Sequence, residues 1–339
     1  MTNGQSLLDG RLGEDELQWL ARRADGGFGL VETCAAHVSR DGKAWPGQLG
    51  VDHDDALPGL SRLAARIRRS GAASIVQLFH GGVRATAKLT GEQVWSASTW
   101  QEPAPDFEVP RAATEADIAR VIEAFAAAAA RAEAAGFDGV ELHGAHGYLL
   151  SQFLSRTFNT RSDGWGGDLA KRARLMREVT RAVRARVSRR FAVGMRLSLE
   201  DRGSTKGMDL DENLEVARWL AEDGVDWIHA SLWDAKAMTT KRPDQHPIPL
   251  LRAALPKQVA VIACGTIWSP SDAKAVLDRG ADLVALGRAG ICNPDWPKQA
   301  RSPSWEPQRP PLTRAQLLDL SVSPVFASYL SRWKNFVAD

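Results

Sequence analysis

The densest group of chemically active side chains in this 339-residue chain is the segment HGAHGYLLSQFLS, which begins at His143. His143 and His146 are three residues apart where an apolar run ends in a turn, so both can face one cavity. Imidazole N–H groups donate to a carbonyl or nitro oxygen and polarise it as charge builds there. Tyr148, one of only two tyrosines, can give a proton to a carbanion-like centre. We therefore expect a site that holds an oxygen atom and delivers a proton.

An H-x-x-H pair can also bind a metal ion. Such a site would need a third ligand, for which Glu141 and His229 are the candidates. Glu141 precedes His143 by two residues on a predicted strand, so their side chains must share one face. We assign no metal ligand in this chain, and a metal-dependent barrel hydrolase or lyase stays open as an alternative.

Glycines and an arginine follow the last two apolar runs of the chain. Gly265 lies in ACGTIWSPSDAK, and Gly287 with Arg288 lies in ALGRAGICNP. Glycine lets backbone N–H groups approach phosphate oxygens, and a following helix adds its positive end. The pattern predicts a phosphate site, although such glycines also serve tight strand-to-helix turns.

Two further polar residues end apolar runs. Arg196 ends FAVGMRLSL, where a buried guanidinium needs an anion or strong acceptors, and a salt bridge to Glu200 or Asp201 would also satisfy it. Gln77 carries a donor and an acceptor that suit the edge of a pyrimidine-like ring. We expect both side chains at the same end of the sheet.

Short apolar runs alternate with helical segments along the chain, which indicates βα units and a parallel sheet. The predicted strands are 29–37, 74–80, 137–146, 191–199, 226–233, 259–265 and 283–289. The predicted helices include 13–25, 54–70, 117–136 and 169–187, and left-handed C-caps are expected at Gly136, Gly224 and Gly280. Polar residues lie at strand ends and no G-x-G-x-x-G follows an early strand, so a (β/α)8 TIM barrel is favoured over an open α/β sheet.

The first strand of this barrel is missing from the prediction. A strand is needed before helix 13–25, but the chain opens with MTNGQSLLDG, which resembles a loop after a strand. Strands 29–37 and 283–289 would then be open edges with unpaired backbone groups. We expect residues 1–300 to form the barrel, and 301–339 to form a Pro-rich linker with a C-terminal helical tail packed on it. Residues 81–113 are expected to form an irregular loop that covers a site.

Composition excludes several classes of protein. The net charge is +2, from 43 basic and 41 acidic residues, so no nucleic-acid partner is expected. No signal peptide and no apolar run of about 20 residues is present, so we expect a cytoplasmic protein without a membrane partner. The three cysteines form no close pair, which argues against disulfides and iron–sulfur ligation. A homo-oligomer is left open.

Four segments carry a family resemblance over nearly the whole chain: GGFGLVETCAAHVSRDGKAWPGQLG, SIVQLFHGGVRA, FDGVELHGAHGYLLSQFLSRTFNTRSDGWGGDLAKRARLMREV and ADLVALGRAGICNPDWP. On these segments the chain resembles the Old Yellow Enzyme family of FMN-dependent NAD(P)H oxidoreductases. The resemblance implies an FMN cofactor, NADPH or NADH as reductant, and an electron-poor alkene as substrate. Hydride would pass from the flavin N5 to the activated C=C bond of an α,β-unsaturated carbonyl or nitro compound.

The resemblance also assigns residues. Seven positions match the cofactor contacts of the family: Thr2, Ala35, Gln77, Arg196, Gly265, Gly287 and Arg288. Of these, the first two would lie near N5 and the C4 carbonyl, the next two at the pyrimidine edge, and the last three at the phosphate. Thr2 is expected on a frayed terminus, which would weaken FMN binding.

For the substrate, the resemblance implies that His143 and His146 bind the activating oxygen and that Tyr148 donates the proton. Loop 81–113 with Trp95, Trp100 and Trp233 is expected to shape the substrate site. A flavin-dependent oxidase or demethylase, and a truncated non-catalytic flavin barrel, remain alternatives. The sequence does not identify the natural substrate or distinguish NADH from NADPH.

Overall fold

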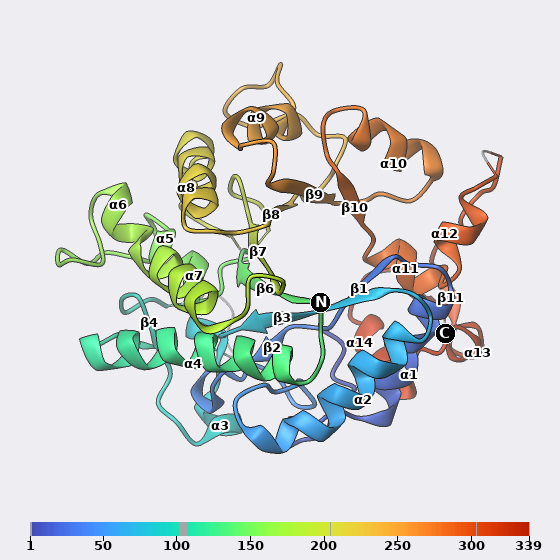
Figure 1. Cartoon of the computed structure of the whole chain (residues 1–339), viewed down its shortest axis with the longest axis horizontal. Helices are drawn as coiled ribbons and strands as arrows, with labels where there is room; N and C mark the ends of the chain where they lie inside the picture. Colours follow the sequence, from blue (N-terminus) through green and yellow to red (C-terminus); the bar gives the residue numbers. More distant parts are fainter. Residues whose placement is uncertain (1, 102–106, 204, 303, 339) are drawn as a thin grey trace.

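The centre of the molecule is a curled sheet of parallel strands, which confirms the predicted barrel class (Figure 1). The protein is described from a computed structural model that covers residues 2–101, 107–203, 205–302 and 304–338. The strands of the main sheet are β1 (Leu30–Glu32), β2 (Ala36–His37), β3 (Ala73–Phe79), β6 (Gly139–Gly144), β7 (Ala192–Leu197), β8 (Trp227–Ser231), β9 (Ala260–Cys264) and β10 (Leu283–Ala285). All seven predicted strand segments are therefore present.

The sheet is open along one side. Its order is β1-β3-β6-β7-β8-β9-β10, and within the described ranges no pairing joins β10 to β1. We call the opening between these two edge strands the seam. Leu283 on β10 is 48% exposed there, because no neighbouring strand covers it. The expectation of a strand missing between segments 283–289 and 29–37 is confirmed.

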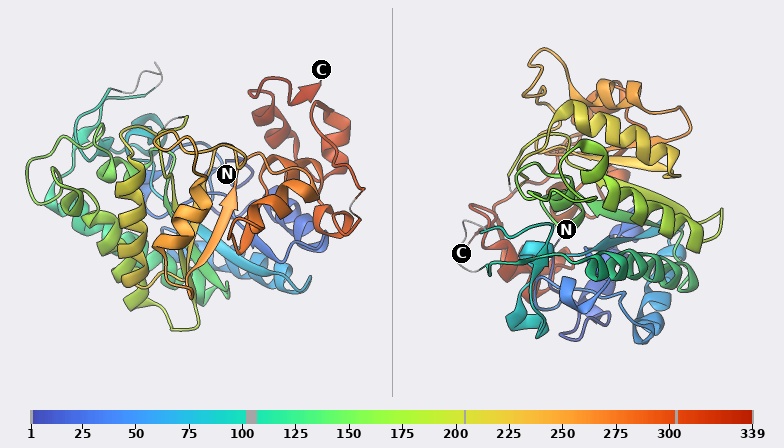
Figure 2. Two further views of the ribbon diagram at one scale, coloured as in Figure 1. Left: turned by 90° about the horizontal axis from the view of Figure 1, so that it is seen from above. Right: turned by 90° about the vertical axis from the view of Figure 1, so that its left-hand side faces the viewer.

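Helices cover the outside of the sheet (Figures 1 and 2). The longer ones are α1 (Glu14–Asp25), α2 (Leu57–Arg68), α4 (Glu115–Ala134), α7 (Arg174–Arg186), α8 (Leu210–Glu222), α9 (Pro247–Ala254) and α10 (Pro270–Leu277). The shorter ones are α5 (Leu149–Leu154), α6 (Leu169–Arg172), α11 (Arg288–Cys292) and α12 (Trp296–Gln299). The left-handed C-caps are confirmed at Gly136, Gly224 and Gly280, where φ is 90°, 100° and 103°. The predicted helix 169–187 is divided into α6 and α7 at Ala173.

Inward side chains form layers because strand residues alternate sides at every second position. The lowest layer is apolar and contains Ile75, Trp227 and Ile262. Gly194 leaves room for the Trp227 indole, since a Cβ at this glycine would lie 1.8 Å from an indole carbon. Two residues further along these three strands the side chains become polar or reactive, as Gln77, His229 and Cys264.

The segment 81–113 is more regular than the sequence suggested. It contains a 3-10 turn (Gly82–Arg84), α3 (Ala87–Thr90), and β4 (Trp95–Ser96) paired in parallel with β5 (Arg111–Ala112), while residues 102–106 lie outside the described ranges. Two more 3-10 turns, Arg40–Gly42 and Asp54–Ala56, precede α2. The prediction of an irregular loop was therefore wrong for these four short elements and holds for most of the other described residues of the segment.

The C-terminal segment packs on the N-terminal helix at one end of the barrel (Figure 2). It contains α13 (Arg314–Asp319), α14 (Pro324–Leu330), and the short pair β11 (Leu312–Thr313) and β12 (Val337–Ala338). The rings of Trp19 on α1 and Phe326 on α14 meet edge to face at 5.5 Å. This contact brings the tail to the strand ends on the seam side.

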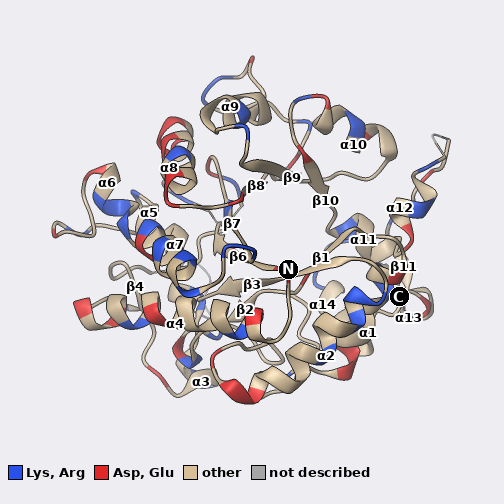
Figure 3. Cartoon of the chain, in the orientation of Figure 1, with Lys and Arg blue, Asp and Glu red and all other residues tan. Residues whose placement is uncertain are grey.

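Both basic and acidic residues are distributed over the outer helices (Figure 3), in keeping with the balanced composition. Of the helices described, none has the length and apolar character that crossing a membrane requires.

Candidate active site

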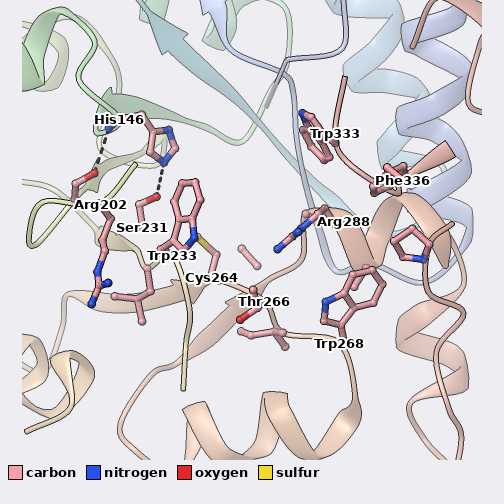
Figure 4. A pocket seen from close by; sticks show the side chains of 18 of the residues that line it. His146, Arg202, Ser231, Trp233, Cys264, Thr266, Trp268, Arg288, Trp333 and Phe336 are labelled. Atoms are coloured by element: carbon pink, nitrogen blue, oxygen red, sulfur yellow. Dashed lines mark hydrogen bonds between the residues drawn. The ribbon is translucent and has the colours of Figure 1, made fainter. Parts of the chain in front are cut away.

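A cavity of about 580 Å³, which we call the first cavity, opens at the carboxyl ends of β7 to β10. Figure 4 shows His146, Ser231, Trp233 and Cys264 on one side of it, and Trp268, Trp333 and Phe336 on the other. Its lining includes five predicted site residues, which are His146, Arg196, Gly265, Gly287 and Arg288. Residues that the sequence singled out separately therefore line the same cavity, although they lie up to 142 positions apart along the chain, from 146 to 288.

The first cavity is built for an anion. Arg288 begins α11 and points into the space between the two groups of side chains (Figure 4). Gly265 has a φ of 131°, and a Cβ there would lie 2.3 Å from the carbonyl oxygen of Leu232. A side chain at that position is thus excluded by the close approach of the Leu232 backbone. Gly287 is exposed beside Arg288 at the start of α11.

Arg196 projects from β7 into the same cavity. Its Nη2 donates to the Cys264 Sγ at 3.3 Å, and its Nε has no hydrogen-bond partner in the part of the chain that the structure describes. The alternative salt bridge was wrong: Glu200 accepts the N–H groups of residues 240 and 241, and Asp201 accepts those of 207 and 208. Arg196 is left with an unused donor and a positive charge.

The two histidines and the tyrosine form one cluster, as the sequence predicted. The ring centroids of His143 lie 4.9 Å from His146 and 5.0 Å from Tyr148. His146 has a left-handed backbone with φ 60°, and its Nε2 lies 2.6 Å from the Ser231 Oγ. Arg84 stacks over the Tyr148 ring at 5.6 Å and donates to the carbonyl oxygens of His146 and Gly147.

Protonation in this cluster is set by burial. Burial, reinforced by the charge of Arg196, holds the pKa of His143 and of His146 well below the usual histidine value. Both imidazoles are therefore neutral at neutral pH. The His143 Nδ1 accepts the N–H of Ala145 at 3.3 Å, so the proton of this ring sits on Nε2. Burial also raises the pKa of Tyr148, which keeps its phenol protonated.

Below the cluster lies a buried polar network. The Gln77 Nε2 donates to Glu141 Oε1 at 2.9 Å and to Glu32 Oε1 at 3.2 Å. The His229 Nδ1 lies 2.8 Å from Glu141 Oε2. Burial and the charge of Glu141 raise the pKa of Glu32 to about 8, so that this carboxyl is neutral at neutral pH. Glu141 stays ionised, since His229 and Arg196 outweigh its burial and hold its pKa far below the usual value.

The histidine pair does not belong to the described side chains that are grouped closely enough to hold a metal ion. Among the described residues, the grouping of donor atoms close enough to hold an ion is Glu32, Glu141 and His229, which lie within 4.8 Å of one another. His143 and His146 are not part of it. Glu141 and His143 lie on the same face of β6, as predicted. They belong to different layers of the barrel.

Several predicted residues lie away from the first cavity. Thr2 and Ala35 are not in its lining, and Gln77 is fully buried beneath it. Asn3, Gln5 and Ser6 are buried, so the segment after Thr2 is packed rather than frayed. The side-chain oxygen of Ser6 hydrogen-bonds the buried Glu16 at 2.5 Å, which fixes this segment on α1.

The three tryptophans that were expected to shape the substrate site lie in different surroundings. Trp95 is buried, and its Nε1 donates to Asp41 Oδ2 at 2.8 Å, so it is a packing residue and its predicted substrate role was wrong. Trp100 packs edge to face on Phe158 and does not line the first cavity. Trp233 lies at the first cavity and is 67% exposed.

Sequence reasoning missed Ser231 as a site residue, together with the tail residues Trp333 and Phe336, and it gave Cys264 no role although this residue ends a strand beside Gly265. Ser231 and Cys264 were detectable, because each ends a predicted strand in the register of an inward residue. The tail residues gave no such signal, since their place at the cavity depends on tertiary packing.

Fold and site together define a barrel enzyme that binds an anionic, phosphate-bearing cofactor beside neutral hydrogen-bond donors. The model of the NADH:flavin oxidoreductase / NADH oxidase family matches residues 1–304. The chain belongs to this family.

Two curated relatives illustrate the similarity. The chain is 37% identical over 304 residues to the probable NADH-dependent flavin oxidoreductase YqiG of Bacillus subtilis, covering 87% of this chain and 80% of that protein. It is 32% identical over 294 residues to an NADPH dehydrogenase of Halalkalibacterium halodurans, covering 86% of this chain and 85% of the relative.

Two solved structures resemble the fold of this chain. An Old Yellow Enzyme homologue from Zymomonas mobilis superposes with a TM-score of 0.80 at 26% identity, covering 91% of this chain and 88% of that one. A mutant of morphinone reductase in complex with tetrahydroNAD gives a TM-score of 0.80 at 26% identity, with 92% and 87% covered. The chain is thus an Old Yellow Enzyme-like flavin oxidoreductase, with FMN as cofactor and NAD(P)H as reductant.

The residues present fit FMN. Arg196 Nε and Gln77 Oε1 are buried and without partners within the described residues, as a donor and an acceptor awaiting a ligand would be. Gly265 and Gly287 line the same cavity without side chains of their own.

Proposed function

We propose that this oxidoreductase is an ene-reductase, which reduces the activated C=C bond of α,β-unsaturated carbonyl or nitro compounds. The observation that carries the proposal is the cluster of two neutral imidazoles and a protonated phenol, which reaches the cation-lined first cavity through His146. Neutral donors suit an oxygen that becomes negative during the reaction, and a protonated phenol suits proton delivery to carbon.

We infer the cofactor positions from the cavity lining together with the family resemblance. Arg288 and the backbone at Gly265 and Gly287 would hold the phosphate. Arg196 and Gln77 would hold the pyrimidine edge, and the positive charge of Arg196 would favour the reduced, anionic ring. Thr2 and Ala35 remain assigned to the N5 side on family resemblance alone.

FMN, when bound, supplies the hydride. His143 would donate from Nε2 to the substrate oxygen, and His146, oriented by the Ser231 hydroxyl, would hold the same oxygen from the other side. Tyr148 would then give its proton to the α-carbon, while Phe79, 4.4 Å from the Tyr148 ring, fixes the phenol. Orientation and oxygen polarisation would account for most of the acceleration.

The test is anaerobic spectroscopy of the purified protein with FMN. Addition of NADPH or NADH should bleach the flavin absorbance, and 2-cyclohexenone should restore it with formation of cyclohexanone. Flavin that is reduced by nicotinamide but reoxidised only by O₂ would favour the oxidase alternative. Flavin that is reduced instead by a methylamine or another saturated donor would favour the demethylase alternative.

A further inference from the structure

A second cavity of about 760 Å³, here named the seam cavity, lies along the opening between β1 and β10. Apolar side chains such as Leu30, Ile75 and Leu283 line its lower part. Its inner end reaches the polar layer of the barrel, at Glu141, His229 and Cys264. Small molecules can therefore approach this layer from a side other than the first cavity.

Cys264, His229 and Glu141 lie together at the inner end of the seam cavity as a thiol, an imidazole and a carboxylate. The His229 Nδ1 hydrogen-bonds Glu141 Oε2 at 2.8 Å, which directs the other ring nitrogen away from the carboxylate. That nitrogen, Nε2, has no hydrogen-bond partner within the described ranges, although His229 is only 3% exposed and lines the seam cavity. An unpartnered buried nitrogen facing a cavity points to a ligand.

The charges around Cys264 favour its ionised form. Burial opposes ionisation, but the positive charges of Arg196 and His229 outweigh it and lower the pKa of the Cys264 thiol to about 6. The charge of Glu141 outweighs the burial of His229 and raises the pKa of this imidazole to about 10. At neutral pH the pair is thus a thiolate beside an imidazolium, and the neutral Glu32 adds no charge.

The other two cysteines provide an internal comparison. Cys34 lines the same seam cavity, but burial and the nearby Glu16 hold its pKa far above the usual thiol value. Burial raises the pKa of Cys292 to about 12. Three buried thiols in one chain therefore differ in ionisation, and only the environment of Cys264 supports a nucleophile.

We propose that Cys264, with His229 and Glu141, is a covalent attachment site for small electron-poor alkenes that enter through the seam cavity. The thiolate sulfur forms a bond to the β-carbon, and the π electron pair of the C=C bond moves to the α-carbon. The His229 Nε2 gives its proton to that carbon and is protonated again from water. The reaction is an addition without change of redox state, so it needs neither NAD(P)H nor the flavin and does not rest on the proposed function.

The test is alkylation of the FMN-saturated protein by acrylamide without reductant, followed by peptide mass spectrometry. Cys264 should be modified at pH 7 while Cys34 and Cys292 are not, and its rate should reach half of its maximum near pH 6. Equal or slower modification of Cys264 relative to Cys34 would overturn the proposal. If bound FMN protected Cys264 completely from acrylamide, entry through the seam cavity would be overturned.

Variants test the role of the histidine. His229→Asn should slow modification of Cys264 at pH 7 by at least about tenfold, since loss of the imidazolium returns the thiol toward its ordinary pKa. His246→Asn is the matched control: this histidine is buried at the start of α9, lines neither cavity and should leave the rate unchanged. An unchanged rate in a folded His229→Asn protein would show that the imidazole does not activate the thiol.

Discussion

Tyr148 is the residue at which the two half-reactions of the proposed cycle can be separated. Its phenol stays protonated because burial raises its pKa, so it is a proton donor at neutral pH. We expect Tyr148→Phe to slow alkene reduction by about 10²-fold or more and to leave flavin reduction by NAD(P)H nearly unchanged. Stopped-flow absorbance of each half-reaction measures both rates.

The other tyrosine of the chain provides the control. Tyr329 lies on α14, where its ring stacks on Phe326 at 6.2 Å, and Tyr329→Phe should change neither half-reaction. An equal loss in both half-reactions of Tyr148→Phe would mean that the phenol positions the cofactor instead of supplying a proton.

Arg288 is expected to recognise the phosphate of FMN. Arg288→Met should weaken FMN binding by about tenfold or more and leave binding of riboflavin, which has no phosphate, unchanged. Fluorescence titration of the apoprotein with both flavins measures the difference. Arg309→Met is the control, because Arg309 stacks over Trp268 at 5.0 Å and lies outside the first cavity's lining. Equal weakening of both flavins would place Arg288 at the ring or ribityl chain.

At the scale of single residues, the sequence indicated which side chains come together better than it indicated which hydrogen bonds they make. The histidine pair and Tyr148 were found because three reactive side chains lie within six positions. Gln77 was also singled out, but its bonds to Glu141 and Glu32 were not, because Glu32 and Glu141 are 109 positions apart and come together only where β1 and β6 flank β3. Strand parity alone would have placed Glu141 and His229 on the inner face.

At the scale of single elements, the start of α10 holds one wall of the first cavity. Asp272 Oδ2 accepts the N–H groups of Ser269 and Trp268 at 3.0 and 3.1 Å, and Oδ1 lies 2.7 Å from the Lys236 Nζ. Burial alone would raise the pKa of Asp272, but the Lys236 ammonium and these N–H groups lower it to about 2. The carboxylate therefore stabilises the folded state in its ionised form.

We expect Asp272→Asn to lower the free energy of unfolding at pH 7 by about 1 kcal/mol. The folded pKa is about 2 and the unfolded value is about 3.9, so the wild-type advantage should be full above pH 4 and should shrink as pH falls toward 2. Urea unfolding of both proteins from pH 3 to 7 measures this. An advantage that does not change over this range would show that the ionised carboxylate is not its source.

Helices and strands were predictable where a periodic pattern extends over several turns or a full strand. The segment 81–113 was not, because β4 and β5 have two residues each and pair across an insertion, which leaves no local period. Trp95 was assigned to the substrate site for the same reason: nothing local shows that its indole faces Asp41.

At the scale of the whole molecule, the open barrel was predictable and its consequences were not. Counting strands shows that one is missing, but the seam cavity and its extension to Cys264 depend on how the whole barrel packs. The seam is bridged at its outer layer by Arg23 of α1. Its guanidinium donates to the carbonyl oxygens of Gly290 and Ile291, at 3.2 and 3.0 Å, and of Leu320 at 2.8 Å.

Arg23 therefore joins the helix before β1 to the segment after β10 and to the C-terminal tail. Arg23→Met should lower the free energy of unfolding by about 2–4 kcal/mol, since buried carbonyls lose their donors while helix propensity is kept. The neighbouring Arg22→Met should cost less than about 1 kcal/mol, because Arg22 pairs with Asp295 where both side chains are about one-third exposed, 31% and 38%. Chemical denaturation of both variants makes the comparison.

Trypsin cleavage near residues 279–288 should accelerate only in Arg23→Met. Equal effects of the two substitutions would mean that the edges of the seam are held together by other contacts.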